Sequence, residues 1–447
     1  MSTIVTRNAP DLPGVARQRL PSHLLVAASS WASRLVSAAV QLVSVRLLLQ
    51  ALGLVDYSAF ALLTGLQGWF LLADLGVGIS VQNHISEARA RGEPTGGLLV
   101  TARLLAVLLL LATLALLYFA SPMLAPLLLK AYPDMSEARK VQTFFIAGAL
   151  SIGFGVGGIV YKVWYAEQRG YLSNVVPAVA AVIGLAGVAV AGRIDPDWRL
   201  AWCLLAFVGP TAALPLGILG VQLLRGGLRA DAPLRFGEVC RRAGGFWAFA
   251  ILGAVTLQVD YIVLSQRLTA RDIATYSLMT KVFGLVFFVY SALILALWPT
   301  FTELIVQRRW PEVVAYLRRY VGLGVGFVAG CTLALLWAMP LAIGLLAGGQ
   351  GIVASTALIL VMGTYWVVRV WTDTFSMLLQ SMNRVRPVLL LVPLQALLSG
   401  ALQWVLAPRL GLVGTVLGLI CSFALTVSWG LPLAAFREFR SATARTP

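Results

Sequence analysis

The chain is poor in the side chains that catalysis and metal binding usually require. Charged residues make up only 12% of its 447 residues, and histidine occurs twice. The cysteines are far apart and show neither a CxxC pair nor a Cys/His spacing, so no metal site or redox pair is indicated. We interpret all four as small apolar residues: Cys203, Cys240, Cys331 and Cys421.

Sequence motifs of several enzyme classes are also missing. No Walker, HExxH, GxSxG or EF-hand sequence occurs, which argues against ATP hydrolysis and metalloprotease chemistry. No DNA- or RNA-binding motif is found either, so a nucleic-acid partner is not expected. Membrane-embedded glycosyltransferases and polysaccharide polymerases generally need a sizeable external loop that carries catalytic residues. The longest external loop expected here, near 121–140, has only about twenty residues. The sequence therefore predicts no enzyme, no metal and no cofactor.

Apolar residues are what the chain has in abundance. They make up 59% of the sequence, and the mean hydropathy is +0.87, values typical of a polytopic, all-α membrane protein. Since about 20 apolar residues cross a bilayer, we predict about twelve transmembrane helices. Their expected bounds are 24–49, 58–83, 98–120, 141–164, 174–192, 199–224, 239–264, 276–301, 319–346, 354–380, 385–406 and 411–436.

The distribution of positive charge predicts the orientation in the membrane. With the N-terminus inside, 22 of the 34 Lys and Arg fall on the cytoplasmic side and nine on the other, as expected because cytoplasmic loops retain positive charge. Both termini are therefore predicted to be cytoplasmic, within a leader at 1–23 and a tail at 437–447. The net charge of +16 then reflects topology and attraction to anionic membrane lipids.

Internal similarity indicates two like halves. An offset of 219 residues aligns Tyr57 with Tyr276 and Gly65 with Gly284, and it superimposes the basic turns at 89–94 and 308–313. Many carriers are built from such repeats. We therefore expect two pseudo-symmetric six-helix lobes, joined by a cytoplasmic linker. The predicted lobes and linker are 24–224, 243–436 and 225–242, respectively.

Three cations lie inside predicted spans: Arg34, Lys281 and Arg369. A charge at this depth costs several kcal/mol unless it faces water, a partner or a ligand, so the three together suggest a chamber for an anion. Their alternative role is structural, as members of ion pairs. Depth along the spans, at about 1.5 Å per residue, allows pairs with three acidic residues, which are also candidates for coupling to protons or sodium ions: Asp74, Asp260 and Asp373.

Two segments resemble a known family. "LVSVRLLLQALGLVDYSAFALLT" looks like the first helix, short external turn and second helix of the polysaccharide flippases, the O-antigen (Wzx-type) members of the multidrug/oligosaccharidyl-lipid/polysaccharide exporter superfamily. "LADLGVGISVQNHISEARARGE" is similar to the end of their second helix and the following basic loop. The resemblance implies a MATE-like fold in the bacterial inner membrane. It also implies a function: flipping an undecaprenyl-pyrophosphate-linked repeat unit from the cytoplasmic to the periplasmic leaflet by alternating access, for O-antigen, capsule or exopolysaccharide export.

The resemblance gives the charged and polar residues an expected role. Arg34, Lys281 and Arg369 would bind the pyrophosphate, because Arg and Lys can replace the water around such an anion. Aromatic rings and amides would line the path of the sugars, although interhelical packing is their alternative role. The candidates are Gln41, Gln67, Trp69, Asn83, Gln258, Tyr261, Tyr290, Trp366 and Trp371. The polymerase and chain-length machinery of the same pathway are the implied protein partners.

Two other functions stay open at this point. A cation-coupled multidrug exporter of the same superfamily would be expected to carry mainly acidic residues in its lumen, so the three cations disfavour it. A membrane-embedded glycosyltransferase or polymerase is disfavoured by the short external loops.

Overall fold

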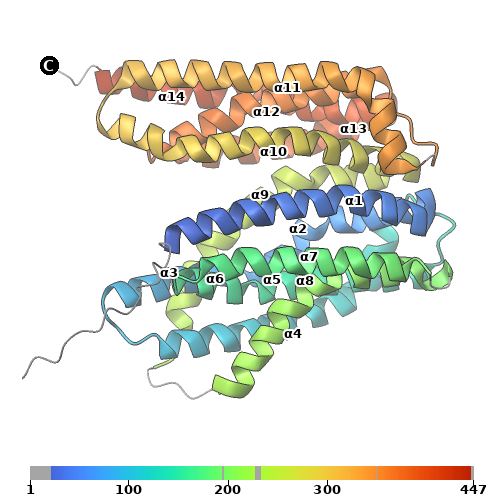
Figure 1. The fold of residues 1–447 in the computed structure, drawn as a ribbon, viewed down its shortest axis with the longest axis horizontal. Helices are drawn as coiled ribbons and strands as arrows, with labels where there is room; N and C mark the ends of the chain where they lie inside the picture. The colour runs from blue at the N-terminus through green and yellow to red at the C-terminus, as the bar shows by residue number, and fades with distance from the viewer. Residues whose placement is uncertain (1–21, 194–195, 227–232, 349, 444–447) are drawn as a thin grey trace, which may run out of the picture.

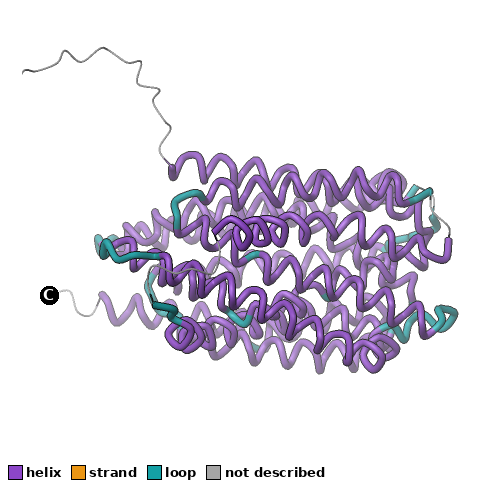
Figure 2. The backbone as a smooth tube through the Cα atoms, turned by 90° about the horizontal axis from the view of Figure 1, so that it is seen from below, coloured by secondary structure: helices purple, strands orange, loops and turns teal. Residues whose placement is uncertain are grey.

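Helices account for the regular structure throughout the described residues, as expected of a chain whose backbone groups must be satisfied inside a bilayer. The computed structural model describes residues 22–193, 196–226, 233–348 and 350–443, and no strand occurs among them (Figure 2). The helices are α1 (Ser22–Gly65), α2 (Gln67–Leu71), η1 (Leu72–Asp74), α3 (Val77–Ala90), α4 (Gly96–Leu128), α5 (Glu137–Gly157), α6 (Ile159–Ala166), α7 (Gly170–Ala191), α8 (Pro196–Gly226), α9 (Phe236–Arg267), α10 (Ala270–Val306), α11 (Trp310–Ala347), α12 (Thr356–Ser381), α13 (Arg386–Leu425) and α14 (Val427–Thr443).

Two long helices are interrupted at the boundaries predicted between the spans 24–49 and 58–83 and between 385–406 and 411–436, and one predicted span contains a break that the sequence pattern did not predict. α1 is interrupted at Gly53 (φ 72°, ψ 179°), and α13 is interrupted at Gly411 (φ 60°, ψ −140°). The predicted span 58–83 is not one continuous helix, because Leu75 and Gly76 both have left-handed backbone conformations between η1 and α3. Glycine permits the breaks at Gly53 and Gly411 at little cost, since it has no Cβ.

The count of twelve membrane crossings stays a prediction. By length and apolar character, eight helical stretches among the described residues can cross a membrane, or nine if the two parts of α9, which meet at 45°, form one span. α12 is not among them because it carries Arg369 and Asp373 within its apolar run.

The predicted ends and linker of the chain are partly helical. Most of the leader 1–23 and the segment 227–232 lie outside the described residues, but α9 already begins at Phe236. α14 runs to Thr443, so the segment predicted as a tail is helical up to that residue.

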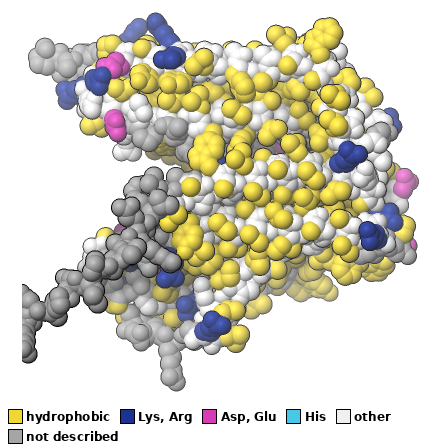
Figure 3. Space-filling view, in the orientation of Figure 1, with side chains coloured by type: hydrophobic (Ala, Val, Ile, Leu, Met, Phe, Trp, Pro, Cys, Tyr) yellow, Lys and Arg dark blue, Asp and Glu magenta, His cyan; other side chains and the backbone are white. Residues whose placement is uncertain are grey.

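The helices form two groups with a hollow between them. α10 to α14 lie on one side and α1 to α8 on the other, and α9 contacts both groups through α13 and α3 (Figure 1). The space-filling view shows apolar side chains over the middle of this face, Lys and Arg toward its two ends, and a hollow between the groups at one end (Figure 3). α1 begins and α14 ends at that same end, as an even number of crossings requires. The symmetry between the two groups stays a prediction.

Polar contacts fix the first half of α9 to α3. Arg242 donates to Glu87 at 2.7 Å, and the Ser80 hydroxyl donates to the carbonyl of Val239 at 2.8 Å. The hydrogen bond from Arg242 lowers the pKa of Glu87, which lies outside the predicted spans. A Cβ at Gly76 would lie 2.5 Å from the carbonyl oxygen of Ala243, so this close approach requires glycine.

Candidate functional site

The centre of the candidate site is a cavity between α1 and α10. Its volume is about 250 Å³, and both Arg34 and Lys281 line it. A second cavity of about 260 Å³ adjoins it and shares Gln41 and Lys281. The polar groups that line the two cavities include Ser33, Ser37, Ser44, Thr64, Gln67, Thr211, Tyr261 and Ser277.

The charge in these two cavities is of one sign. No Asp or Glu is among the described residues that line either of them. The Nζ of Lys281 lies 5.7 Å from the ring centre of Tyr57, an electrostatic contact between the ammonium group and an aromatic face. Amides, hydroxyls and two cations around one space form a set of donors suited to an anion and its attached hydroxyl groups.

Local sequence explains how Lys281 reaches this position. α10 starts with a capping box, in which the Thr269 hydroxyl accepts from the backbone of Asp272 and the Asp272 carboxylate accepts from the backbone of Thr269. Such a cap fixes the first turn of a helix, and Lys281 follows about three turns later, roughly 17 Å along the axis. Arg34 lies on α1, which packs against α10.

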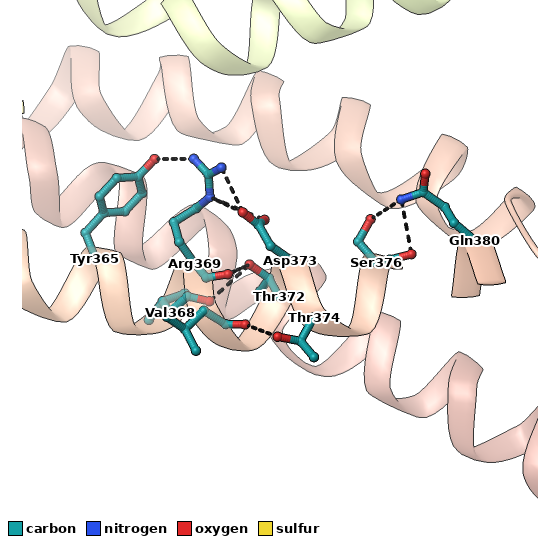
Figure 4. A network of polar contacts seen from close by, with 9 residues as sticks. Tyr365, Val368, Arg369, Thr372, Asp373, Thr374, Ser376 and Gln380 are labelled. Carbon is teal, nitrogen blue, oxygen red and sulfur yellow. Dashed lines mark hydrogen bonds and ion pairs between the residues drawn. The ribbon is translucent and has the colours of Figure 1, made fainter. Parts of the chain in front are cut away.

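Arg369 lies in a different environment, on α12. Its Nε and Nη2 donate to Asp373, with an N–O distance of 2.9 Å from Nη2, and its Nη1 donates to the hydroxyl of Tyr365 at 3.2 Å (Figure 4). The guanidinium also lies 5.4 Å from the ring centre of Phe287 and 5.7 Å from that of Trp366. The ion pair predicted between Arg369 and Asp373 is therefore present, and it neutralises this cation.

The other two predicted ion pairs are not formed. Asp74 accepts from the backbone amide of Gly76 at 2.9 Å, and no ion pair joins it to Arg34 in the described part of the chain. Asp260 accepts from the hydroxyl of Tyr276 and from the backbone amide of Tyr261. No ion pair connects it to Lys281 within the described ranges. Depth along a span does not fix the direction in which a side chain points, and that direction decides both cases.

Some predicted sugar-lining residues do face the cavities. Gln41, Gln67 and Tyr261 line them. Gln258 lies just beyond, against Gly68 of α2, and its buried Oε1 has no hydrogen-bond partner in the part of the chain that the structure describes. Its position next to the cavities leaves a sugar-binding role open as a prediction.

The other predicted sugar-lining residues are mainly packed between helices. Tyr290 is buried, shares a hydrogen bond of 2.6 Å with Thr374, and lies against Gly324. Trp371 donates to the carbonyl of Ser428 at 2.7 Å, on α14. Trp371 is the second residue after Arg369, which places it on the opposite face of α12. The buried indole N–H groups of Trp69 and Trp366 have no hydrogen-bond partner among the described residues, and Asn83, on α3, lines neither cavity.

Sequence reasoning missed two aromatic residues at this site. Trp31, on α1, packs edge-to-face on Phe288 of α10, with ring centres 6.5 Å apart. Phe288 itself lines the cavity that holds Arg34. The available signal was the spacing: Trp31 lies three residues before Arg34 and Phe288 seven residues after Lys281, which places each on the same helix face as its cation.

Comparison with curated proteins shows close relatives over nearly the whole chain. A Salmonella typhi protein named as an O-antigen transporter is 38% identical over 418 residues, which are 93% of this chain and 96% of the relative. A Yersinia pseudotuberculosis protein named as an O-antigen export protein is 35% identical over 435 residues, covering 96% of this chain and 98% of the relative. No family model matches the chain.

Solved structures show the same fold. The inward closed conformation of the lipid II flippase MurJ aligns with a TM-score of 0.70, at 11% identity, over 94% of this chain and 90% of that one. An inward-facing multidrug resistance MATE family transporter of the MOP superfamily aligns with a TM-score of 0.66, at 11% identity, over 92% of this chain and 96% of that one. The predicted MATE-like, all-helical membrane fold is thereby confirmed.

Proposed function

The chain belongs to the family of O-antigen transporters, and we propose that it flips a lipid-linked oligosaccharide across the membrane for polysaccharide export. It is a multi-pass membrane transporter and not an enzyme. The observation that supports this substrate class is the pair of adjoining cavities in which Arg34 and Lys281 occur together without a carboxylate. A drug exporter for cations would gain nothing from such a lining, because like charges repel.

In this proposal the anionic link between lipid and sugar lies between α1 and α10. The pyrophosphate of an undecaprenyl-pyrophosphate-linked repeat unit is a compact anion, which Arg34 and Lys281 bind through charge-assisted hydrogen bonds. Gln41, Gln67 and Tyr261 then contact the attached sugars, since they continue the lining into the second cavity. The repeat unit passes from the cytoplasmic to the periplasmic leaflet of the bacterial inner membrane, with both termini of the protein cytoplasmic, and becomes available there to the polymerase and chain-length machinery.

Arg369 contacts the substrate at a different place from Arg34 and Lys281. Three of its N–H groups already bind Asp373 and Tyr365. An approaching pyrophosphate therefore has to compete with Asp373 for the guanidinium. Such competition suits a second, weaker binding site that the substrate reaches after it leaves Arg34 and Lys281.

Asp260 is the candidate for coupling to a proton gradient. Its carboxyl oxygens receive hydrogen bonds from a hydroxyl and an amide but have no cation partner among the described residues. An ionised carboxylate held in this way is costly inside a membrane protein, so a proton taken up by Asp260 stabilises the state described here. Asp74, beside Lys162, is the weaker candidate.

The test is binding of undecaprenyl pyrophosphate to purified protein. Arg34→Ala and Lys281→Ala should each weaken binding by at least tenfold, since each removes a charge-assisted contact of about 1.5–3 kcal/mol. Arg46→Ala is the matched control, because Arg46 is an exposed arginine on the same helix that lines neither cavity. Equal binding by all four proteins would remove the cations from the substrate site.

Coupling is tested separately with Asp260→Asn, which keeps the shape of the side chain and removes its charge. Transport by this variant in inside-out vesicles should lose its dependence on an imposed pH gradient. An unchanged dependence would place proton coupling elsewhere in the molecule.

A further inference from the structure

An apolar groove lies on the face of α1 next to the one that contacts α10. It runs between α1 and α7 and has a volume of about 350 Å³. Its lining is almost entirely aliphatic: Ser29, Ala32, Ser33, Val36, Val175, Ala178, Val179, Val182 and Ile183. The same Ser33 also lines the cavity of Arg34 and Lys281, so the groove and that cavity are neighbours around α1.

We propose that this α1/α7 groove holds the first part of the polyisoprenoid chain of the substrate while the pyrophosphate lies at Arg34 and Lys281. The inference rests on the proposed function and adds a binding site for the lipid part. An anion that is covalently attached to an apolar chain cannot enter a charged cavity alone. The first isoprene units come with it and need an apolar surface within reach of the phosphate.

The contacts around α1 favour α7 over α10 as the side where the chain lies. On the α10 side, Trp31 and Phe288 bridge the two helices. On the α7 side the surface is hollowed, and the three valines of α7 that line it are between 42% and 49% exposed: Val175, Val179 and Val182. Apolar surface of this kind gains about 25 cal/mol for each Å² that a chain covers.

The groove has the right depth for this role. Its residues span Ser29 to Val36 on α1 and Val175 to Ile183 on α7, roughly 10 and 12 Å along the two axes. Arg34 falls inside the α1 stretch, so the groove overlaps in depth with the cavity of Arg34 and Lys281, here called the head cavity. The groove therefore accommodates the beginning of a long isoprenoid chain, and the remainder extends into the bilayer.

The experiment fills the groove and compares three ligands. Ala32→Trp places a large ring in it, and Ala39→Trp is the matched control, because Ala39 is an exposed alanine of the same helix that lines neither the groove nor the cavities. Purified proteins are tested for binding of undecaprenyl pyrophosphate, geranyl pyrophosphate and inorganic pyrophosphate, with Arg34→Ala as a third variant. Val179→Trp tests the groove independently from α7.

We expect Ala32→Trp and Val179→Trp to weaken binding of both isoprenoid ligands by about tenfold, because a few buried methylene groups are displaced. Inorganic pyrophosphate should bind these variants as it binds the native protein, which also shows that they are folded. Arg34→Ala should weaken binding of all three ligands.

Three results would overturn the groove proposal. If Ala32→Trp and Ala39→Trp bind the isoprenoid ligands equally well, ordinary membrane lipid occupies the groove, while the effect of Arg34→Ala still supports the proposed function. If Ala32→Trp weakens inorganic pyrophosphate as much as the others, the substitution acts on the head cavity. If Arg34→Ala changes nothing, the head site fails, and the groove proposal fails with it.

Discussion

The ion pair of Arg369 and Asp373 can be tested as a structural element and as a substrate contact at the same time. Removing one partner leaves the other charge uncompensated, which costs 3–5 kcal/mol at a fully buried site. The two side chains are 17% and 33% exposed, so water reduces this cost. We expect Arg369→Gln to lower the free energy of unfolding by about 2 kcal/mol.

The double variant Arg369→Gln/Asp373→Asn separates the two roles. Neutral amides four residues apart on one helix face can still hydrogen-bond, so most of the lost stability should return, with a coupling energy of about 1–2 kcal/mol. Transport should not return, because the guanidinium is still missing. Unfolding is followed by tryptophan fluorescence of purified protein, and transport by surface O-antigen in a bacterium that lacks its own O-antigen transporter.

Two outcomes would refute this reasoning. Normal export by the double variant would exclude Arg369 from substrate transfer and leave the pair purely structural. A single variant as stable as the native protein would show that Asp373 does not need its partner. Arg309→Gln is the control, since the pair of Arg309 with Glu312 is 52% and 44% exposed and should contribute less than about 1 kcal/mol.

Three further predictions concern the fold. Gly53→Ala should destabilise the protein by about 1–3 kcal/mol, because φ 72° with ψ 179° is a conformation that only glycine adopts freely; thermal unfolding measures this. Gly414→Ala places a Cβ 2.2 Å from the carbonyl oxygen of Leu406 and should cost about 1–3 kcal/mol, whereas Gly326→Ala meets no atom within 4 Å and should be nearly neutral in the same assay. Glu87→Gln should lower the unfolding temperature at neutral pH and low salt only. The lowered pKa of Glu87 stabilises the folded state above the pKa of an unfolded glutamate, about 4.3. This stabilisation is lost as the pH falls through the pKa of Glu87 in the folded protein. A difference that persists in acid would point to packing instead.

Composition and hydropathy were sufficient to predict the fold class, because a chain this apolar can satisfy its backbone only as membrane helices. The breaks at Gly53 and Gly411 fall at boundaries between predicted spans, because hydropathy ends one span and begins the next there. The break inside the predicted span 58–83 was harder to predict. The interruption at Leu75 depends on the close approach of α9 to Gly76, a contact between segments far apart in the sequence.

One contact near the candidate site, the ion pair of Arg369 and Asp373, was predicted correctly because sequence spacing alone sets its geometry. Arg369 and Asp373 are four residues apart on one helix, so their contact follows from the helical repeat. Arg34 with Asp74 and Lys281 with Asp260 were matched by depth alone. The rotation of each helix about its axis, which depends on packing against its neighbours, turned these side chains elsewhere. Tyr276 became the partner of Asp260, and no sequence spacing indicates this contact across two helices.

Because Arg34 and Lys281 carry like charges, the stability of the folded protein depends on whether the substrate is bound. Two cations that line one cavity repel each other, and an anion between them converts that repulsion into attraction. Ligand binding to the folded chain therefore raises its stability by RT ln(1 + [L]/Kd), about 2.7 kcal/mol at a hundredfold excess over Kd. Heat resistance of the purified transporter thus reports occupancy directly, and a set of candidate glycolipids can be ranked by melting temperature before any export assay exists.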